Sequence, residues 1–198
     1  MKLANMKDSS AIALNETKIR AKKLLKACQQ DELPAKQRVT TLMVKLGILH
    51  SDLQLKHCQQ VIARELGFID FYHCQRVLSG QAILGDDWGS LFHTKQCDTL
   101  LNHWFTGYLA ARDFNTQAEG TLLLPYKKQF FVVERQDYYN TLNLSITSQQ
   151  VDNASEPTIL RDLVSSYANA DWNALALAMI QHKLHQGLMM AEIVSASS

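Results

Sequence analysis

The stretch IARELGFIDFYHCQRVLSG, residues 62–80, decides how the first half of the chain is organised. Apolar residues recur at helical spacing on both sides of Gly67, and this pattern predicts two helices joined at a glycine corner. We expect the corner to pack a helix over 53–66 against a helix over 71–78. Two phenylalanines should lie inside it, Phe68 and Phe71.

A glycine corner between two helices is also typical of the helix-turn-helix that reads DNA. In that register the second helix turns apolar residues inward at positions 73 and 76, where this chain has His73 and Arg76. The match is recovered only by deleting one residue after Gly67, which rotates a helix face by about 100°. Phe71 and Tyr72 also stand where small polar residues normally approach base edges. The stretch therefore indicates a packing unit rather than a DNA-reading one.

Helical spacing continues through the rest of residues 1–83. Pro34 separates a first helix from a second, which ends at Gly47. Ser51 and Gln54 fit a capping box that opens the third helix. Asp70 is a favourable N-cap for the fourth. Two cysteines lie on apolar stripes of adjacent helices and should be buried and unbridged, Cys58 and Cys74.

Residues 81–90 are predicted to link the two subregions of the chain. The region 84–198 has signals for both helices and strands. The longest helix is predicted to start at Thr94, with the residues of its stripe being Cys97, Leu100, Leu101, Trp104, Tyr108 and Ala111. Two apolar runs around Pro-Tyr-Lys-Lys predict a β-hairpin near 121–134. Helix should return with Ile159, Leu160, Leu163 and Val164, then Trp172, Leu175, Ala176 and Met179, and the last ten residues should be loosely held. The predicted fold class is α+β, mainly α.

A family resemblance covers residues 55–78, LKHCQQVIARELGFIDFYHCQRVL. This segment resembles a small helical module of bacterial proteins that is described as related to the glyoxalase superfamily. The matching residues are His57, Gln59 or Gln60, Ala63, Gly67, Phe68, Asp70 and Phe71, the last replacing a commoner tryptophan. The resemblance implies a helical packing unit and no lyase activity, because residues 1–83 offer no predicted strands for the paired βαβββ units of glyoxalase-type enzymes.

Charge is distributed unevenly along the chain although the net charge is only +1. Residues 1–83 carry 13 Lys+Arg and 7 Asp+Glu, a net of +6, whereas residues 84–198 carry 7 and 12, a net of −5. The two halves either face and screen each other, or the basic half attracts nucleic acid through Lys18, Lys22 and Lys26. No apolar run is long enough for a membrane span, and the N-terminus does not resemble a secretory signal. We therefore expect a cytoplasmic protein with reduced thiols and no membrane partner.

Motifs for catalysis are not evident. The sequence has no nucleophile elbow, zinc-protease motif, phosphate-binding glycine loop or dinucleotide fingerprint, and its His and Cys spacing does not suit zinc. We therefore assign no catalytic residue, metal or cofactor.

The loop GDDWGSLFH, residues 85–93, is the least explained stretch. Asp86 or Asp87 and His93 could form an acid–base pair beside Trp88. The alternative is a turn made by the two acids, with Trp88 filling the junction between the two halves and packing against the helix that carries Trp104. The hairpin turn offers Tyr126, Lys127 and Lys128 to an anion, and the two segments would form one site if they approach each other.

Three functions remain open at this stage. The first is a non-enzymatic interaction or regulatory protein that binds a protein partner. The second is a small enzyme or ligand-binding protein, with a polar site between the halves that takes a small anion. The third is a nucleic-acid binder that uses the basic N-terminal helix.

Overall fold

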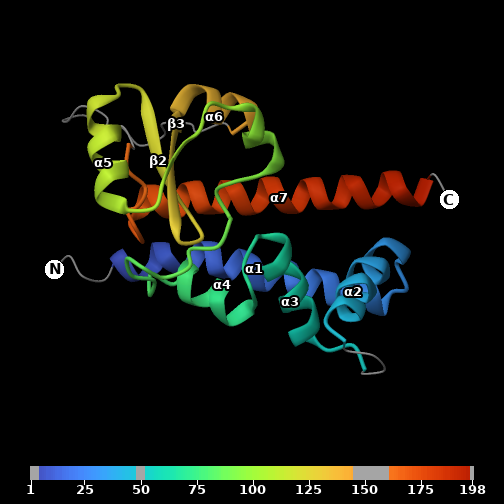
Figure 1. The fold of residues 1–198 in the computed structure, drawn as a ribbon. Coiled ribbons are helices and arrows are strands. Elements are labelled where there is room, and N and C mark those ends of the chain that lie inside the picture. Colours follow the sequence, from blue (N-terminus) through green and yellow to red (C-terminus); the bar gives the residue numbers. More distant parts are fainter. Residues whose placement is uncertain (1–4, 48–51, 145–160, 197–198) are drawn as a thin grey trace.

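The fold of the chain is α+β and mainly α, as predicted, in the computed structural model, which describes residues 5–47, 52–144 and 161–196 (Figure 1). Within these residues the first half contains helices alone and the second half contains a small antiparallel sheet. Helix α7 lies between the layer of α1–α4 and the layer that holds the sheet (Figure 1). In chain order the elements are α1 (Asn5–Gln29), α2 (Leu33–Lys45), α3 (Leu55–Glu65), α4 (Phe71–Leu78), the 3-10 helix η1 (Lys95–Thr99), β1 (His103–Phe105), α5 (Tyr108–Gln117), β2 (Thr121–Tyr126), β3 (Gln129–Glu134), α6 (Arg135–Thr141) and α7 (Ala170–Ala196).

The predicted corner between α3 and α4 is confirmed. Gly67 has a φ of +92°, and a Cβ there would collide with Ser90 Oγ, so both the turn and the close approach require glycine. Asp70 caps α4 by accepting a hydrogen bond from the His73 N–H at 2.7 Å. The Gln60 side chain closes the corner, since it donates to the Ile69 carbonyl and accepts from the Phe71 N–H, both at 3.3 Å. Phe68 is buried and Phe71 is half-buried against the core.

The start of α3 differs from the prediction. Ser51 lies outside the described residues, and the N-cap of α3 is Gln54. The Gln54 N–H donates to Nδ1 of His57 at 3.2 Å, so a buried histidine satisfies one of the donors at the helix end. His57, three residues after the observed N-cap Gln54, thus makes the capping contact that the predicted capping box assigned to Gln54.

The predicted long helix from Thr94 is wrong. The segment instead contains η1, β1 and the start of α5. The Asn102 side chain ends the first turn by donating to the carbonyls of Cys97 at 2.7 Å and Leu100 at 3.0 Å. The aromatic residues that follow pair with β3, where Trp104 lies opposite Phe131. Strand pairing therefore overrides the helical spacing of the apolar residues.

The hairpin near 121–134 is confirmed as β2 and β3, and the sheet order is β1-β3-β2. The helix predicted around Leu163 is wrong, while Ile159 and Leu160 lie outside the described residues. The Leu123 N–H donates to the Arg161 carbonyl at 2.9 Å, and the Leu163 N–H donates to the Leu123 carbonyl at 3.0 Å. Residues 161–163 thus cover the outer edge of β2, because an open edge strand needs backbone partners. Helix α7 continues to Ala196, and the last two residues lie outside the described ones.

The core is one cluster that draws on both halves of the chain. Cys58 and Cys74 are buried free thiols, as predicted. Trp88 is buried, with 3% of its surface exposed, and its ring packs against Tyr167 at 4.7 Å between centroids. Trp104 is 44% exposed and lies on β1, so the expected contact of Trp88 with a helix that carries Trp104 is wrong. Among the described residues, no helix combines the length and the apolar character that crossing a bilayer demands.

Candidate functional site

The loop 85–93 and the hairpin turn lie against each other. The Trp88 N–H donates to the Lys127 carbonyl at 2.9 Å, and the Lys127 N–H donates to the Gly89 carbonyl at 2.6 Å. Lys127 takes a φ of 51°, the left-handed conformation that a tight turn between β2 and β3 demands. The two segments therefore do approach each other, but the contacts between them are made by backbone groups.

The side chains of the two segments do not converge. Asp86 and Asp87 contact α4, and Trp88 points into the core. Lys127 lies over the ring of Tyr126, with Nζ 5.2 Å from the ring centroid, and Lys128 is exposed. No ion pair joins either lysine to either aspartate in the part of the chain that the structure describes. The single polar cluster suggested by the sequence is not formed.

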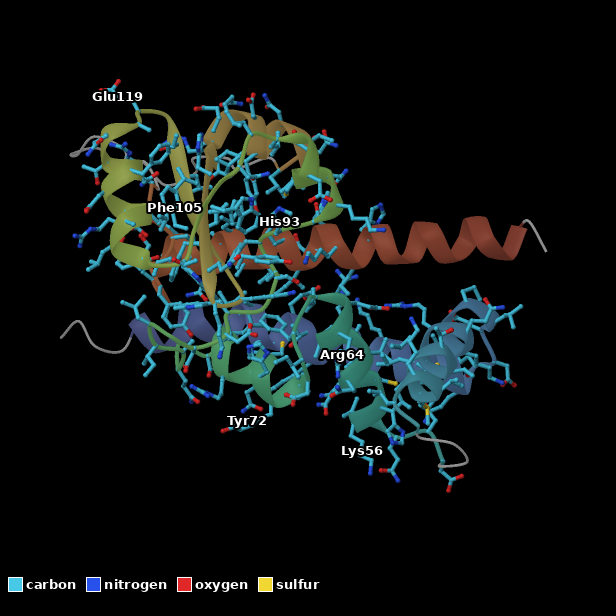
Figure 2. The ribbon with its side chains drawn as sticks, in the orientation of Figure 1. Lys56, Arg64, Tyr72, His93, Phe105 and Glu119 are labelled. Atoms are coloured by element: carbon cyan, nitrogen blue, oxygen red, sulfur yellow. The ribbon has the colours of Figure 1, made fainter. Side chains whose placement is uncertain are left out.

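His93 occupies an aromatic cluster between the sheet and α7 (Figure 2). Its ring lies 5.3 to 5.4 Å from the rings of Trp104, Tyr126 and Phe131. Burial lowers the pKa of His93, and the nearby Asp98 offsets part of that effect. Its Nε2 has no hydrogen-bond partner within the described residues, because Asp98 Oδ1 is 3.9 Å away. The acid–base pair suggested between His93 and Asp86 or Asp87 is not formed, since both aspartates have partners near α4.

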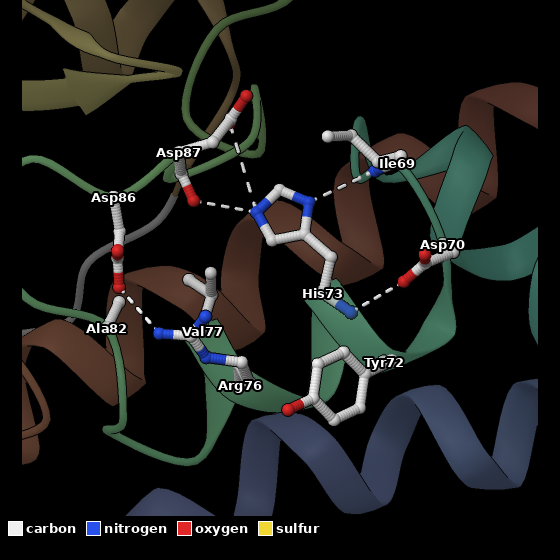
Figure 3. A pocket seen from close by; sticks show the side chains of 9 residues that line it. All are labelled: Ile69, Asp70, Tyr72, His73, Arg76, Val77, Ala82, Asp86 and Asp87. Carbon is white, nitrogen blue, oxygen red and sulfur yellow. Dashed lines mark hydrogen bonds and ion pairs between the residues drawn. The ribbon is translucent and has the colours of Figure 1, made fainter.

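His73, a residue that sequence reasoning did not select, links α4 to the loop (Figure 3). Its Nδ1 accepts from the Ile69 N–H at 3.1 Å, so Nδ1 is unprotonated in this arrangement. Nε2 must then carry the proton, which it donates to the Asp87 carbonyl at 2.7 Å. Both ring nitrogens are thus engaged with backbone groups, and His73 is held as the neutral Nε2–H tautomer.

The carboxylates beside His73 also have structural partners. Asp86 forms an ion pair with Arg76 at 2.7 Å and accepts from the Ile83 N–H at 3.1 Å. Oδ1 of Asp87 accepts from the Gly89 N–H at 2.7 Å. These contacts hold the loop on α4. They do not arrange Asp86 or Asp87 as one member of an acid–base pair.

A pocket of about 220 Å³ lies between α4 and the loop (Figure 3). Its volume is below the ~300 to 1,000 Å³ that is usual for small-molecule sites. Its lining combines apolar and ionisable side chains, which are Ile69, Asp70, Tyr72, His73, Arg76, Val77, Ala82, Asp86 and Asp87. Among the described residues, no group of three or more His, Cys, Asp or Glu side chains is arranged to hold a metal ion.

Large apolar side chains that line this pocket, or that follow its lining residue Ala82 in the chain, remain exposed. Ile69 is 53% and Tyr72 is 71% exposed, and both line the pocket. Ile83 is 69% and Leu84 is 56% exposed, and they follow Ala82 in the turn that Asp86 closes. Figure 2 shows Tyr72 at the outer edge of the molecule. We call these four residues together with the pocket the α4 surface.

The lysines proposed for nucleic-acid binding lie on α1. Lys22 and Lys26 are exposed and Lys18 is partly exposed. Ile19, which directly follows Lys18, is also exposed. On the same helix Arg20 is paired with Glu16 at 2.6 Å. The exposed residues of α1 therefore include apolar as well as basic side chains, as is usual for an amphipathic helix.

Lys183 is a partly buried cation that sequence reasoning missed. Its Nζ, on α7, donates to the Ser90 carbonyl at 2.6 Å and the Leu66 carbonyl at 3.4 Å. Burial lowers the pKa of Lys183 from 10.5 to about 8, because no carboxylate among the described residues is close enough to offset the loss of water. Lys183 joins α7 to the α3–α4 corner and to the loop.

The pKa of Lys183 predicts a pH dependence of stability. Below pH 8 the amine is charged in both states, and the folded state bears the full cost of burying it. As the pH rises above 8 the folded state loses the proton first, so stability rises. Wild type should gain about 2 kcal/mol over Lys183→Met between pH 7 and pH 9.5. Urea unfolding of both proteins at each pH measures this, and parallel pH profiles would show that the amine is not buried as described.

Comparison of the chain with protein-family models, with curated proteins and with solved structures gave no match. The function must therefore be argued from the residues themselves.

The α4 surface contains residues that sequence reasoning did not select, namely Ile69, Tyr72, His73, Arg76, Ile83 and Leu84. A signal for some of them exists in the sequence. Tyr72 lies off the apolar stripe of its helix, and Ile83-Leu84 is an apolar pair inside a polar link. Large apolar residues at positions that the helical pattern assigns to solvent are the signal that could have indicated this surface.

Proposed function

We propose that this chain is a non-enzymatic cytoplasmic protein that binds a protein partner through the α4 surface. The observation that carries the proposal is the exposure of four large apolar side chains. Ile69 and Tyr72 line the pocket, and Ile83 and Leu84 directly follow its lining residue Ala82. Grouped apolar residues with a polar pocket among them are typical of interaction sites, and tyrosine is enriched at their energetic centres. The rigid α3–α4 corner supports the proposal, because a surface held in place loses little entropy on binding.

The engagement of the ionisable residues favours binding over catalysis at this surface. A general base needs a free lone pair within reach of a substrate proton. The one acceptor lone pair of the neutral His73 ring, on Nδ1, is committed to the Ile69 N–H, and its Nε2–H donates to the Asp87 carbonyl. Asp86 is neutralised by Arg76. The small volume of the pocket also suits one side chain of a partner better than a whole substrate.

The resemblance of residues 55–78 to a glyoxalase-related helical module is best interpreted, we propose, as that of a packing unit. His57 accepts a hydrogen bond at the start of α3, and Gln60 closes the corner. Gly67 permits the turn and Asp70 caps α4. Each of these motif residues has a structural contact that accounts for its chemical type.

Site-specific photo-crosslinking in the cells that express the chain tests the proposal. Benzoylphenylalanine is placed at Tyr72 or at Ile83, and at Leu109 on α5 as the control. Leu109 is 63% exposed and belongs to the other layer of the molecule. We expect one discrete protein adduct shared by positions 72 and 83 and absent from position 109.

A second variant makes the crosslinking result specific. Ile69→Asp adds a charge to the same surface at a residue that is already exposed, so it should leave the fold intact and abolish the adduct at position 72. The proposal fails if positions 72 and 83 give no adduct, or give the same mixture of adducts as position 109.

A further inference from the structure

We infer that the partner presents an apolar segment that carries a lysine or arginine, and that this basic side chain enters the pocket of the α4 surface. The inference rests on the proposed function and specifies the chemistry of the partner. The exposed apolar side chains of the α4 surface, Ile69, Tyr72, Ile83 and Leu84, define the area to be covered. The charges of the residues that line the pocket define which charged side chain the partner's segment must carry.

The first step is the charge of the pocket. Its lining contains three aspartates and one arginine. Arg76 is already neutralised by Asp86, and His73 is neutral in its Nε2–H tautomer. Asp70 and Asp87 therefore carry the remaining negative charge, and the N-terminus of α4 offsets only part of that on Asp70. An anionic group would have to displace Asp86 from Arg76, whereas a cation needs no ion pair to break.

The second step is the capacity of the two carboxylates to accept further hydrogen bonds. Oδ1 of Asp70 accepts from the His73 N–H and Oδ1 of Asp87 accepts from the Gly89 N–H. No described lysine or arginine lies within ion-pair distance of either group in the ranges 5–47, 52–144 and 161–196. Figure 3 shows the two residues on opposite sides of the His73 ring. Each carboxylate can accept from an added ammonium or guanidinium group.

The third step is the neighbouring aromatic ring. Tyr72 lines the pocket and is mostly exposed, so its face is available to a cation. The methylene groups of a lysine or arginine can cover Ile69 while the charged end reaches the aspartates. A basic side chain thus suits both the apolar and the charged parts of the lining.

The test uses N-acetyl-arginine amide and its uncharged isostere N-acetyl-citrulline amide as probes, titrated into the ¹⁵N-labelled full chain. We expect saturable shifts of the amide signals of residues 69–76 and 82–88 with the arginine compound and at least tenfold weaker binding of the citrulline compound. The variants Asp70→Asn and Asp87→Asn keep the oxygens that accept from His73 and Gly89, so the fold is preserved. Combined, they should weaken arginine binding at least tenfold. Asp137→Asn on α6, which changes the charge by as much as each of the two substitutions alone, is the control and should have no effect.

Equal shifts with both probes, or an unchanged response in the double asparagine variant, would overturn the inference. The same variant separates this inference from the proposed function. If the adduct at position 72 persists and the purified partner binds the double variant with unchanged affinity, the α4 surface is still the binding face but the basic side chain is wrong. If the arginine probe binds as expected and no adduct forms, the proposed function fails instead.

Discussion

Trp88→Ala should lower the free energy of unfolding by about 3 to 5 kcal/mol, the usual cost of removing a large buried aromatic ring. The Trp88 ring is buried and packs edge-on against Tyr167, which in turn contacts Trp172 at 5.1 Å. The Tyr167 hydroxyl donates to the Val77 carbonyl at 2.6 Å and accepts from the Ala82 N–H at 3.0 Å. Losing the ring should therefore weaken the junction between the two halves, and chemical unfolding followed by circular dichroism measures the loss.

Two other variants make the Trp88 result specific. Trp88→Phe keeps an aromatic ring and removes an indole N–H that has no partner within the described residues, so it should cost less than half as much. Trp104→Ala removes a half-exposed ring from β1 and should also cost less. A Trp88→Ala protein within 1 kcal/mol of wild type would contradict the described packing. We also predict from the sequence that the chain is one cooperative unit, and unfolding of residues 1–83 and 84–198 in separate transitions would contradict this prediction.

Gly89→Ala should cost about 2 to 5 kcal/mol, because two effects add at this position. Gly89 has a φ of +70°, which is unfavourable for any residue with a Cβ. The added Cβ would also lie 2.6 Å from Cδ1 of Phe68 and 3.1 Å from the Gly67 carbonyl oxygen. Neither neighbour is free to move, since Phe68 is buried and Gly67 forms the corner. The urea midpoint of the purified variant measures the cost.

Gly47→Ala is the matched control for this prediction. Gly47 has almost the same φ, +68°, and a Cβ there would meet nothing within 4 Å. It should cost about 1 to 2 kcal/mol, the conformational part alone. Equal effects of the two substitutions would mean that the loop does not approach the α3–α4 corner as closely as described.

The helices of the first half were predictable because their local signals agree with the tertiary structure. Asp70 is a good N-cap by type, and glycine at position 67 permits a φ that other residues avoid. The apolar stripe that contains Cys58 and Cys74 faces the core, as its spacing predicts. Where propensity, capping and hydrophobic pattern all point to one structure, reading the sequence is reliable.

The region after Thr94 was mispredicted because its structure is decided by residues that are distant in sequence. Trp104 lies opposite Phe131 in the sheet, and residues 161–163 cover the edge of β2. Neither partner can be identified from local spacing, since a short apolar run fits a helix and a strand equally well. Asn102, which ends η1 with its side-chain amide, was the one local signal against a continuous helix.

The candidate site was only partly predictable. Asp86 and Asp87 line the pocket, as residues of an unusual loop that the sequence had already indicated. His93 and Trp88 turn away from the pocket, because aromatic residues of the sheet surround the His93 ring and Tyr167 packs against the Trp88 ring. Sequence gives no measure of exposure for Ile83 or Tyr72, whose surroundings depend on how α4 and the loop pack. The surface therefore became evident only in three dimensions.

The most direct test of the α4 surface as the binding face is the dissociation constant of the partner identified by crosslinking, measured for two matched variants. Tyr72→Asp and Leu109→Asp each place one carboxylate at an exposed apolar position, the first on α4 and the second on α5. We predict that Tyr72→Asp raises the dissociation constant at least tenfold while Leu109→Asp leaves it within twofold of wild type. Equal affinities for Tyr72→Asp and wild type, or a larger loss for Leu109→Asp, would contradict the account.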